Sequence, residues 1–385
     1  MHKKKGGKVY CCLIAVIFAA VLGVFFLLQV VSPDKSYSEL ENRNLQTTPQ
    51  FNISQLTSGR YGSHTEKWVS DQFPFRSGWI QIKDLADRVL GKVESNHIFL
   101  AKKGYLIEDF IGAKEENYRM QLDGLRRFAK KHPNLKQSML VAPTALNIYE
   151  DLLPAFVKTG NQDAYLDRIR SEVEEMGITF VDVRDAFRAA DEVQLYYKTD
   201  HHWTTDGAYI AYRKFAETMK WDDRNTSYHR IPVSDSFSGT MTASSGFRMS
   251  EKEPIYVYLP EESSESAEKY TVNYVKEAEK TASLYCSEKL NQRNQYEVFL
   301  GGNHPLVKIC TTSETGRTLL VVKDSYANCF LPFLVEHYDK ILVVDPRYYS
   351  DSLSGLVNSE QVTDVLYLYN ANTLAQDSSL VTVLE

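Results

Sequence analysis

The sequence predicts an α/β protein: a three-layer sandwich with a flavodoxin-like parallel sheet, a small mostly β insertion and an N-terminal transmembrane helix. Patterns typical of buried strands alternate with helical patterns along most of the chain. This alternating part lacks short hairpin turns, which favours parallel strands with helices on both faces of the sheet. An almost unbroken apolar run from Val9 to Val31 precedes it. The 385 residues are enough for one large domain with an insertion.

The N-terminus has the pattern of a single-pass membrane anchor. Residues 1–8 carry four lysines, and the apolar run of residues 9–31 that follows is long enough to cross a bilayer as a helix. Positive residues on the short side keep that end in the cytoplasm and place the rest outside the cell membrane. No convincing cleavage site follows the run, so we expect an uncleaved anchor, with a cleaved signal peptide as the alternative.

The exported part divides into a tether and one catalytic domain. Residues 32–58 are polar and contain two prolines, which predicts a tether between membrane and domain. Residues 59–385 form the predicted domain. The net charge of -6 gives no general basic surface, so nucleic acid is not an expected partner.

The predicted elements of this domain follow one another in a regular order. A hairpin-like pair at 98–100 and 104–106 comes first, and a helix over 118–131 begins the alternation. The predicted strands cover 138–142, 178–183, 318–323, 341–345 and 365–369. The predicted helices cover 164–176, 185–190, 204 or 205 to 219, 326–338 and 352–358.

The alternation of strands and helices fails between residues 228 and 303. Runs at 255–258, 270–275 and 296–300 alternate like antiparallel strands. We therefore expect a mostly β insertion beside the functional site.

Cysteine usage is sparse. Cys11 and Cys12 lie in the apolar run, which leaves three cysteines in the exported part. Cys286 and Cys310 could pair, whereas Cys329 is expected to be a packed thiol of the core.

An acid and a histidine stand two positions apart just before a predicted helix. On an extended backbone, Asp200 and His202 would emerge on the same side and His201 would face the other way. A carboxylate close to a histidine can accept the Nδ1 proton and leave Nε2 free as a base for a hydroxyl nucleophile. The spacing therefore favours part of a catalytic triad.

The expected hydroxyl belongs to Ser325. It follows the predicted strand 318–323 and begins the next helix, the place where open α/β sheets carry their chemistry. The helix N-terminus would offer partial positive charge to an oxyanion. In the plainer interpretation Ser325 or Asp324 is only a helix cap.

Two other interpretations of the acid-histidine pair remain open. Asp200, His201 and His202 are all possible metal ligands, but adjacent histidines should point apart and no cluster elsewhere supplies further ligands. Alternatively, Asp200 and His202 merely satisfy each other at a helix start. We expect no metal and no cofactor.

Two segments together carry a family resemblance. Thr199-Asp200-His201-His202-Trp203-Thr204 and Lys323-Asp324-Ser325-Tyr326 resemble the DHHW family, relatives of the alginate O-acetyltransferases within the SGNH-hydrolase superfamily. The usual N-terminal glycine-aspartate-serine block of that superfamily is absent, so the order looks permuted. Further similar blocks lie at 39–43, 71–76, 104–106, 142–144, 301–303, 345–349 and 368–370.

The resemblance implies an extracytoplasmic enzyme that forms an acetyl-serine and passes the acetyl group to a polysaccharide hydroxyl. The acetyl donor would be a membrane-bound O-acyltransferase partner. Carried over to this chain, Ser325 becomes the nucleophile, His202 the general base and Asp200 its orienter. The Ser325 and Tyr326 backbone N–H groups, Arg347 and Asn303 become candidates for oxyanion or substrate binding.

The predicted function is thus a membrane-anchored O-acetyltransferase acting on a cell-envelope or exopolysaccharide. An acetylesterase would use the same three residues, and only the attacking group, water or a sugar hydroxyl, would differ. A non-catalytic envelope scaffold or glycan-binding protein is the alternative from another class.

Overall fold

The computed structural model describes residues 3–38, 43–51, 53, 56, 60–221, 227–247, 249, 251–261 and 270–384. The chain forms two compact units that meet in sequence between Lys92 and Val93. This boundary lies well after the predicted end of the tether at residue 58. The family-like block at 39–43 lies mostly outside the described residues.

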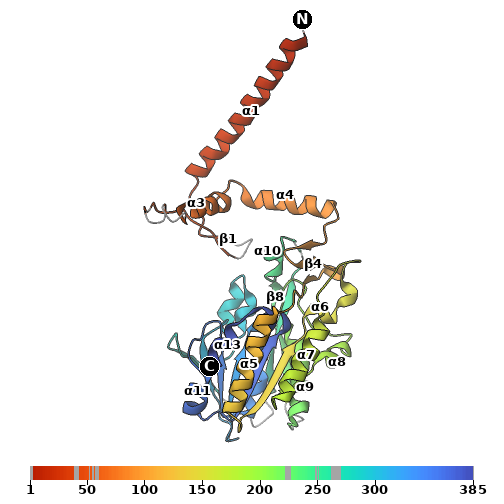
Figure 1. Cartoon of the computed structure of the whole chain (residues 1–385), viewed down its shortest axis with the longest axis vertical. Coiled ribbons are helices and arrows are strands. Elements are labelled where there is room, and N and C mark those ends of the chain that lie inside the picture. The colour runs from red at the N-terminus through yellow and green to blue at the C-terminus, as the bar shows by residue number, and fades with distance from the viewer. Residues whose placement is uncertain are drawn as a thin grey trace. The chain divides into compact units, whose positions relative to one another are not determined.

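The first unit is mostly helical (Figure 1). The stretch Cys12–Val31 of its first helix is long and apolar enough to cross a membrane, a test that a signal sequence also passes. The unit contains α1 Lys3–Val31, β1 Tyr37–Ser38, β2 Arg43–Asn44, α3 Arg60–Asp71 and α4 Arg76–Val89.

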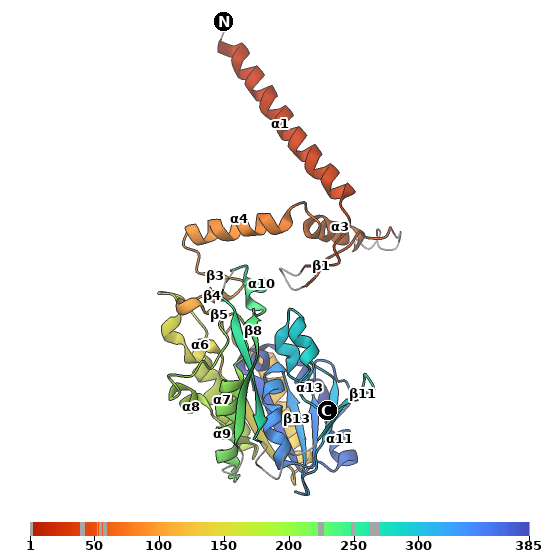
Figure 2. The same ribbon diagram turned by 180° about the vertical axis from the view of Figure 1, so that it is seen from behind.

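The second unit is built on one mixed sheet of eight strands (Figures 1 and 2). Five strands, from β14 to β7, run parallel, as the sequence predicts, and the other three run antiparallel. The insertion supplies two of the antiparallel strands and so extends the main sheet. In spatial order the sheet comprises β11 Glu279–Thr281, β10 Thr271–Tyr274, β12 Leu306–Cys310, β14 Lys340–Val344, β13 Thr318–Lys323, β15 Asp364–Asn370, β6 Lys136–Ala142 and β7 Thr179–Phe180.

Helices cover both faces of this sheet. Helix α5 lies in front of it in Figure 1 and behind it in Figure 2, while Phe330, between η5 and η6, contacts Tyr212 and Phe215 of α9. The helices are α5 Glu115–Lys131, α6 Ala145–Ile148, α7 Gln162–Glu175, α8 Arg184–Arg188, α9 Thr205–Met219, α10 Met241–Ser245, α11 Leu353–Glu360, α12 Ala371–Gln376 and α13 Ser379–Val383. The 3-10 segments are η1 Lys102–Gly104, η2 Glu150–Leu152, η3 Ser287–Asn291, η4 Gln295–Val298, η5 Ser325–Cys329 and η6 Leu331–His337.

Two small sheets complete the unit. The predicted hairpin is confirmed: β4 Ile98–Leu100 pairs antiparallel with β5 Leu106–Glu108 and with β3 Glu94–Ser95. In the insertion, β8 Tyr228–Phe237 pairs with β9 Glu253–Pro260.

Two predicted elements are wrong. The predicted helix over 326–338 is split into the 3-10 segments η5 and η6, because Pro332 lacks the N–H that a continuous α-helix needs. The predicted strand over 296–300 is the 3-10 turn η4 with the residues that follow it. Phe299 and Leu300 are consecutive in the sequence and both buried. The side chains of this segment therefore do not alternate between a buried and an exposed face, as those of a half-buried strand would.

The cysteines whose side chains the structure describes, Cys12, Cys286, Cys310 and Cys329, are free thiols. Cys286 and Cys310, which could have paired, are both unpaired. Cys329 is fully buried, as expected of a core thiol, and burial raises its pKa to about 12. At neutral pH it is therefore a packed, protonated side chain.

Candidate active site

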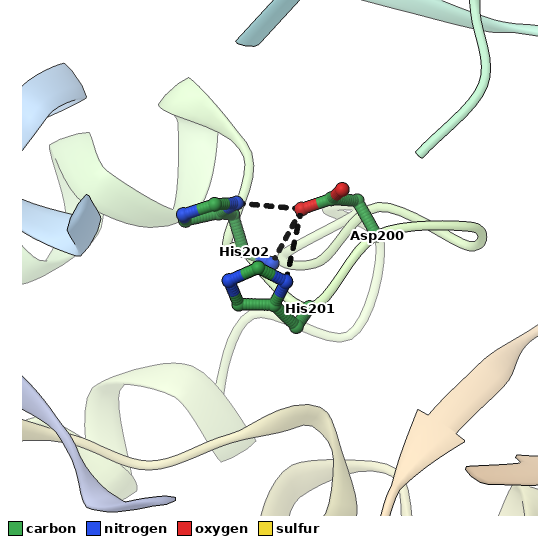
Figure 3. Close-up of side chains that lie close together, drawn as sticks. All are labelled: Asp200, His201 and His202. Carbon is green, nitrogen blue, oxygen red and sulfur yellow. Dashed lines mark hydrogen bonds and ion pairs between the residues drawn. The ribbon is translucent and has the colours of Figure 1, made fainter. Parts of the chain in front are cut away.

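Asp200, His201 and His202 lie in a loop just before α9. An isolated bridge between Tyr196 and Trp203 closes the loop, and Thr204 caps the helix by accepting the Gly207 N–H, as predicted. One oxygen of Asp200, Oδ1, lies 2.5 Å from Nδ1 of His202 and also accepts the His202 backbone N–H at 3.1 Å (Figure 3). The predicted acid-histidine pair is therefore formed.

Ser325 meets this pair from the other end of the chain. It follows β13, and its Oγ lies 2.7 Å from Nε2 of His202. Asp200 is 1% exposed and His202 6%. The structure thus brings a hydroxyl, an imidazole and a buried carboxylate into one hydrogen-bonded line, in the order a serine nucleophile requires.

The environment of Asp200 keeps it ionised. Burial alone would raise its pKa, but electrostatic attraction to His201 and His202 and hydrogen bonds from His202 and Thr240 outweigh burial and lower it. Thr240 donates its N–H at 2.8 Å and its hydroxyl at 3.0 Å to Oδ2. An ionised Asp200 places the ring proton of His202 on Nδ1, so Nε2 faces Ser325 as an acceptor.

His201 does not face away from the pair, so that expectation is wrong. Its ring centroid lies 3.9 Å from that of His202, and its Nδ1 lies 3.6 Å from Asp200 Oδ1 (Figure 3). The reason is local: residues 198–202 form bends rather than a strand, so side chains do not alternate. Burial and the neighbouring His202 lower the pKa of His201.

The same three side chains are a group that could hold a metal ion, with one ligand atom from each within 4.8 Å of the others. The argument that adjacent histidines point apart therefore fails. However, the Asp200 oxygens already accept hydrogen bonds from His202 and Thr240. Coordination through His202 Nδ1 would break its hydrogen bond to Asp200, so the geometry favours the hydrogen-bonded pair over a metal site.

The insertion holds the Asp200 loop in place. Glu253 of β9 is buried and accepts the N–H groups of Lys198 and Thr199 at 2.6 and 3.0 Å and the Thr199 hydroxyl at 2.7 Å. Gly239 donates its N–H to Thr199 Oγ1 at 2.8 Å. Thus the predicted insertion does more than lie beside the site, because it fixes the acid that orients His202.

The Tyr326 N–H is not free to bind an oxyanion, contrary to expectation. It donates to Asp324 Oδ1 at 2.8 Å, and the Asp324 side chain caps η5. Asp324 also accepts the N–H and the Nδ2–H of Asn370, at 2.8 and 2.6 Å, while burial raises its pKa. The plainer interpretation of Asp324 as a cap is therefore correct, and the cap leaves Ser325 itself facing His202.

Asn303 and Arg347 belong to a polar network behind the serine. Nζ of the buried Lys323 donates to Asn303 Oδ1 and Asn328 Oδ1, both at 2.8 Å, and burial lowers the Lys323 pKa to about 8. Arg347 binds both oxygens of Asp345, at 2.8 and 2.6 Å. Their predicted partners were substrate atoms, whereas their observed partners are protein side chains.

Arg347 nevertheless also reaches a pocket. This polar cavity of about 370 Å³ is lined by His201, Arg347 and side chains that can donate or accept hydrogen bonds. The other lining residues are Glu108, Asn370, Asn372, Thr373, Gln376 and Asp377. Because His201 lies against His202, the cavity adjoins the Ser325 site.

Tyr296 is a site residue that the sequence analysis did not identify. Its ring stacks on the His202 imidazole with centroids 3.8 Å apart and planes 14° apart. Its hydroxyl donates to the Ser325 carbonyl at 3.2 Å. It thus links the His202 ring to the Ser325 backbone. The sequence analysis had placed Tyr296 only in a predicted strand that the structure does not contain.

Fold and site together define a class of protein: an α/β protein with a serine, a histidine and an acid at the carboxyl end of its parallel strands. The model of the SGNH hydrolase-like domain, acetyltransferase AlgX, matches residues 105–292 of the chain. This confirms the SGNH-type resemblance. The matched region contains Asp200 and His202 and ends before Ser325.

Solved structures share this fold. A DHHW family protein from Eubacterium siraeum is similar with a TM-score of 0.62 and 22% identity, over 75% of this chain and 96% of that one. PatB1 from Bacillus cereus is similar with a TM-score of 0.58 and 17% identity, over 73% of this chain and 98% of that one. At these identities the likeness establishes the fold. No curated protein sequence matches the chain.

We expect Gly239→Ala to damage the site from outside it. A Cβ there would lie 2.3 Å from both Asp200 Cβ and the Thr199 carbonyl oxygen, so the Asp200 loop must move. The free energy of unfolding should fall by about 1–3 kcal/mol and ester turnover should fall with it. Urea unfolding and hydrolysis of a chromogenic acetyl ester measure both. Gly355→Ala, whose Cβ meets nothing within 4 Å, is the control; unchanged turnover in Gly239→Ala would contradict the role given to this contact.

Tyr296 should act by positioning His202. Tyr296→Leu removes the stacked ring, and we expect kcat to fall about ten- to a hundredfold with less change in KM. Tyr296→Phe keeps the ring and should restore most of the rate. Steady-state kinetics of both variants test this. Equal losses of kcat in Tyr296→Leu and Tyr296→Phe would mean that the hydroxyl, and not the stacked ring, positions His202.

Proposed function

We propose that this protein is a membrane-anchored, extracytoplasmic O-acetyltransferase that acts on a cell-envelope or exopolysaccharide through an acetyl-serine. The observation that carries the proposal is the 2.7 Å contact between His202 Nε2 and Ser325 Oγ, with Asp200 behind the imidazole. The match to an SGNH hydrolase-like acetyltransferase domain supports the class of reaction.

The geometry supports a two-step transfer. Ser325 Oγ attacks the acetyl carbonyl carbon of the donor while His202 Nε2 takes the hydroxyl proton. His202 returns that proton to the leaving group, whose bond to the acetyl carbon breaks, and acetyl-Ser325 remains. A sugar hydroxyl then attacks the acetyl group and gives its proton to His202, and Ser325 Oγ leaves and takes the proton back. Asp200 stabilises the imidazolium in both steps.

The oxyanion needs donors that are not already engaged. The Ser325 N–H at the start of η5 has no acceptor within the described parts of the chain, so we assign it this role. Arg347 lines the adjoining pocket and is the proposed side-chain contact for donor or acceptor. Asn303, bound to Lys323, is proposed to support this network.

A polysaccharide fits the polar pocket. Amide, hydroxyl, carboxylate and imidazole groups line it, and these bind sugar hydroxyls. The apolar stretch Cys12–Val31 is the proposed anchor, which keeps the unit outside the cell at the membrane. There, a membrane-bound O-acyltransferase would supply the acetyl group.

Substitutions should separate the two histidines. Ser325→Ala and His202→Ala should lower the turnover of a chromogenic acetyl ester by about 10³-fold or more. His201→Ala should have a much smaller effect, roughly tenfold, because only His202 contacts Ser325 Oγ. A chelator should leave the rate unchanged. If His201→Ala were as damaging as His202→Ala, or if chelation abolished turnover, the assigned roles would be wrong.

The acceptor distinguishes a transferase from an esterase. The full chain in detergent, given an acetyl ester and envelope polysaccharide, should transfer acetyl groups to the polysaccharide, whereas Ser325→Ala should not. Mass spectrometry of the digested polysaccharide and the yield of free acetate measure the two fates. Acetate release that is unaffected by polysaccharide, with no acetylated sugar, would instead make the protein an acetylesterase.

A further inference from the structure

Helix α4 of the first unit exposes an apolar face to its surroundings. Trp79, Ile82, Leu85 and Val89 recur at helical spacing and are 48%, 60%, 64% and 79% exposed. Lys83, elsewhere on the helix, forms an ion pair with Asp87 at 2.9 Å. A row of exposed apolar side chains along one helix marks an interaction surface.

A groove extends this surface toward α3. It has a volume of about 870 Å³ and is lined largely by apolar groups of the two helices and of the connection between them, among them Tyr61, Val69, Phe73 and Ile80. Trp79 lines the groove and also belongs to the exposed face of α4, so the two are continuous. Lys83 and Arg76 lie at the groove as well.

The apolar stretch of α1 contacts α4 and the connection between α3 and α4. The Phe25 ring stacks on Phe73 with centroids 5.5 Å apart, and lies 6.2 Å from the Trp79 ring. Gln29, one turn further along α1, is buried. Figures 1 and 2 both show α3 and α4 at the C-terminal end of α1. If α1 spans the bilayer, these rings lie at the outer edge of that bilayer.

The predicted tether does not separate α3 from the membrane. Asp34 accepts the indole N–H of Trp68 at 2.9 Å, and the Lys35 N–H donates to Gln72 at 2.9 Å. The Gln46 N–H donates to Asp71 at 2.8 Å. Residues directly after the apolar stretch are thus bound to α3, which holds α3 and α4 close to the end of α1.

We propose that the apolar face of α4 and its groove lie in the outer lipid leaflet, with acyl chains as their occupant. A tryptophan flanked by aliphatic side chains on one helix face suits the boundary between headgroups and acyl chains. The inference depends on the proposed anchor, because a cleaved α1 would remove the contact at Phe25. The second unit follows in sequence at Val93, four residues after α4 ends.

The test is quenching of tryptophan fluorescence in the full chain, reconstituted in nanodiscs of phosphatidylcholine with or without brominated acyl chains. Trp79 should be quenched by brominated lipid. The fluorescence intensity lost to brominated lipid should fall by at least half in Trp79→Phe, which keeps an apolar side chain, and should be unchanged in Trp221→Phe, whose tryptophan lies in the second unit.

Each outcome bears on a different claim. An equal loss of fluorescence intensity in wild type and Trp79→Phe overturns the lipid contact, whether water, a second copy or the catalytic unit covers the face. Failure of the chain to co-elute with nanodiscs, with α1 shown by mass to be absent, overturns the anchor instead. Ester turnover in the same samples reports on the Ser325 site, so its loss is distinguishable from both.

Discussion

The geometry of the candidate site depends above all on one buried carboxylate that stays ionised. Asp200 is almost completely buried, and a charge in that position is costly unless donors surround it. His202 and Thr240 supply those donors. The bond to Asp200 in turn fixes the orientation of the His202 ring. Everything that the site can do follows from the Nε2 atom that this pairing leaves pointing at Ser325.

Three distant parts of the chain meet at the site: the Asp200 loop, the insertion and the end of β13. The insertion contributes Glu253 and Thr240, which hold the Asp200 loop, and it contributes Tyr296, which stacks on His202. The end of β13 contributes Ser325, and Asp324 caps the turn there by binding both Tyr326 and Asn370. The insertion is therefore part of the candidate site, and its strands β10 and β11 extend the main sheet.

The sequence predicted what is local and missed what depends on packing. The parallel strands and the pairing of Asp200 with His202 follow from short-range patterns, as does Ser325 at a strand end. The direction of His201 was wrong because bends replaced the assumed extended backbone. The role of Tyr296 depends on its contact with His202, which is far away in the chain. The Tyr326 N–H is occupied because the neighbouring Asp324 side chain caps it. The periodicity of a sequence reports neither kind of contact.

The central claim is that Ser325 is a nucleophile activated by His202, and covalent labelling tests it most directly. Folded wild-type protein is treated with a fluorophosphonate, and the adduct is located by peptide mass spectrometry. The account predicts one adduct on Ser325, absent in Ser325→Ala and formed much more slowly in His202→Ala. No adduct on the folded wild type, or an adduct that persists in Ser325→Ala, would contradict it.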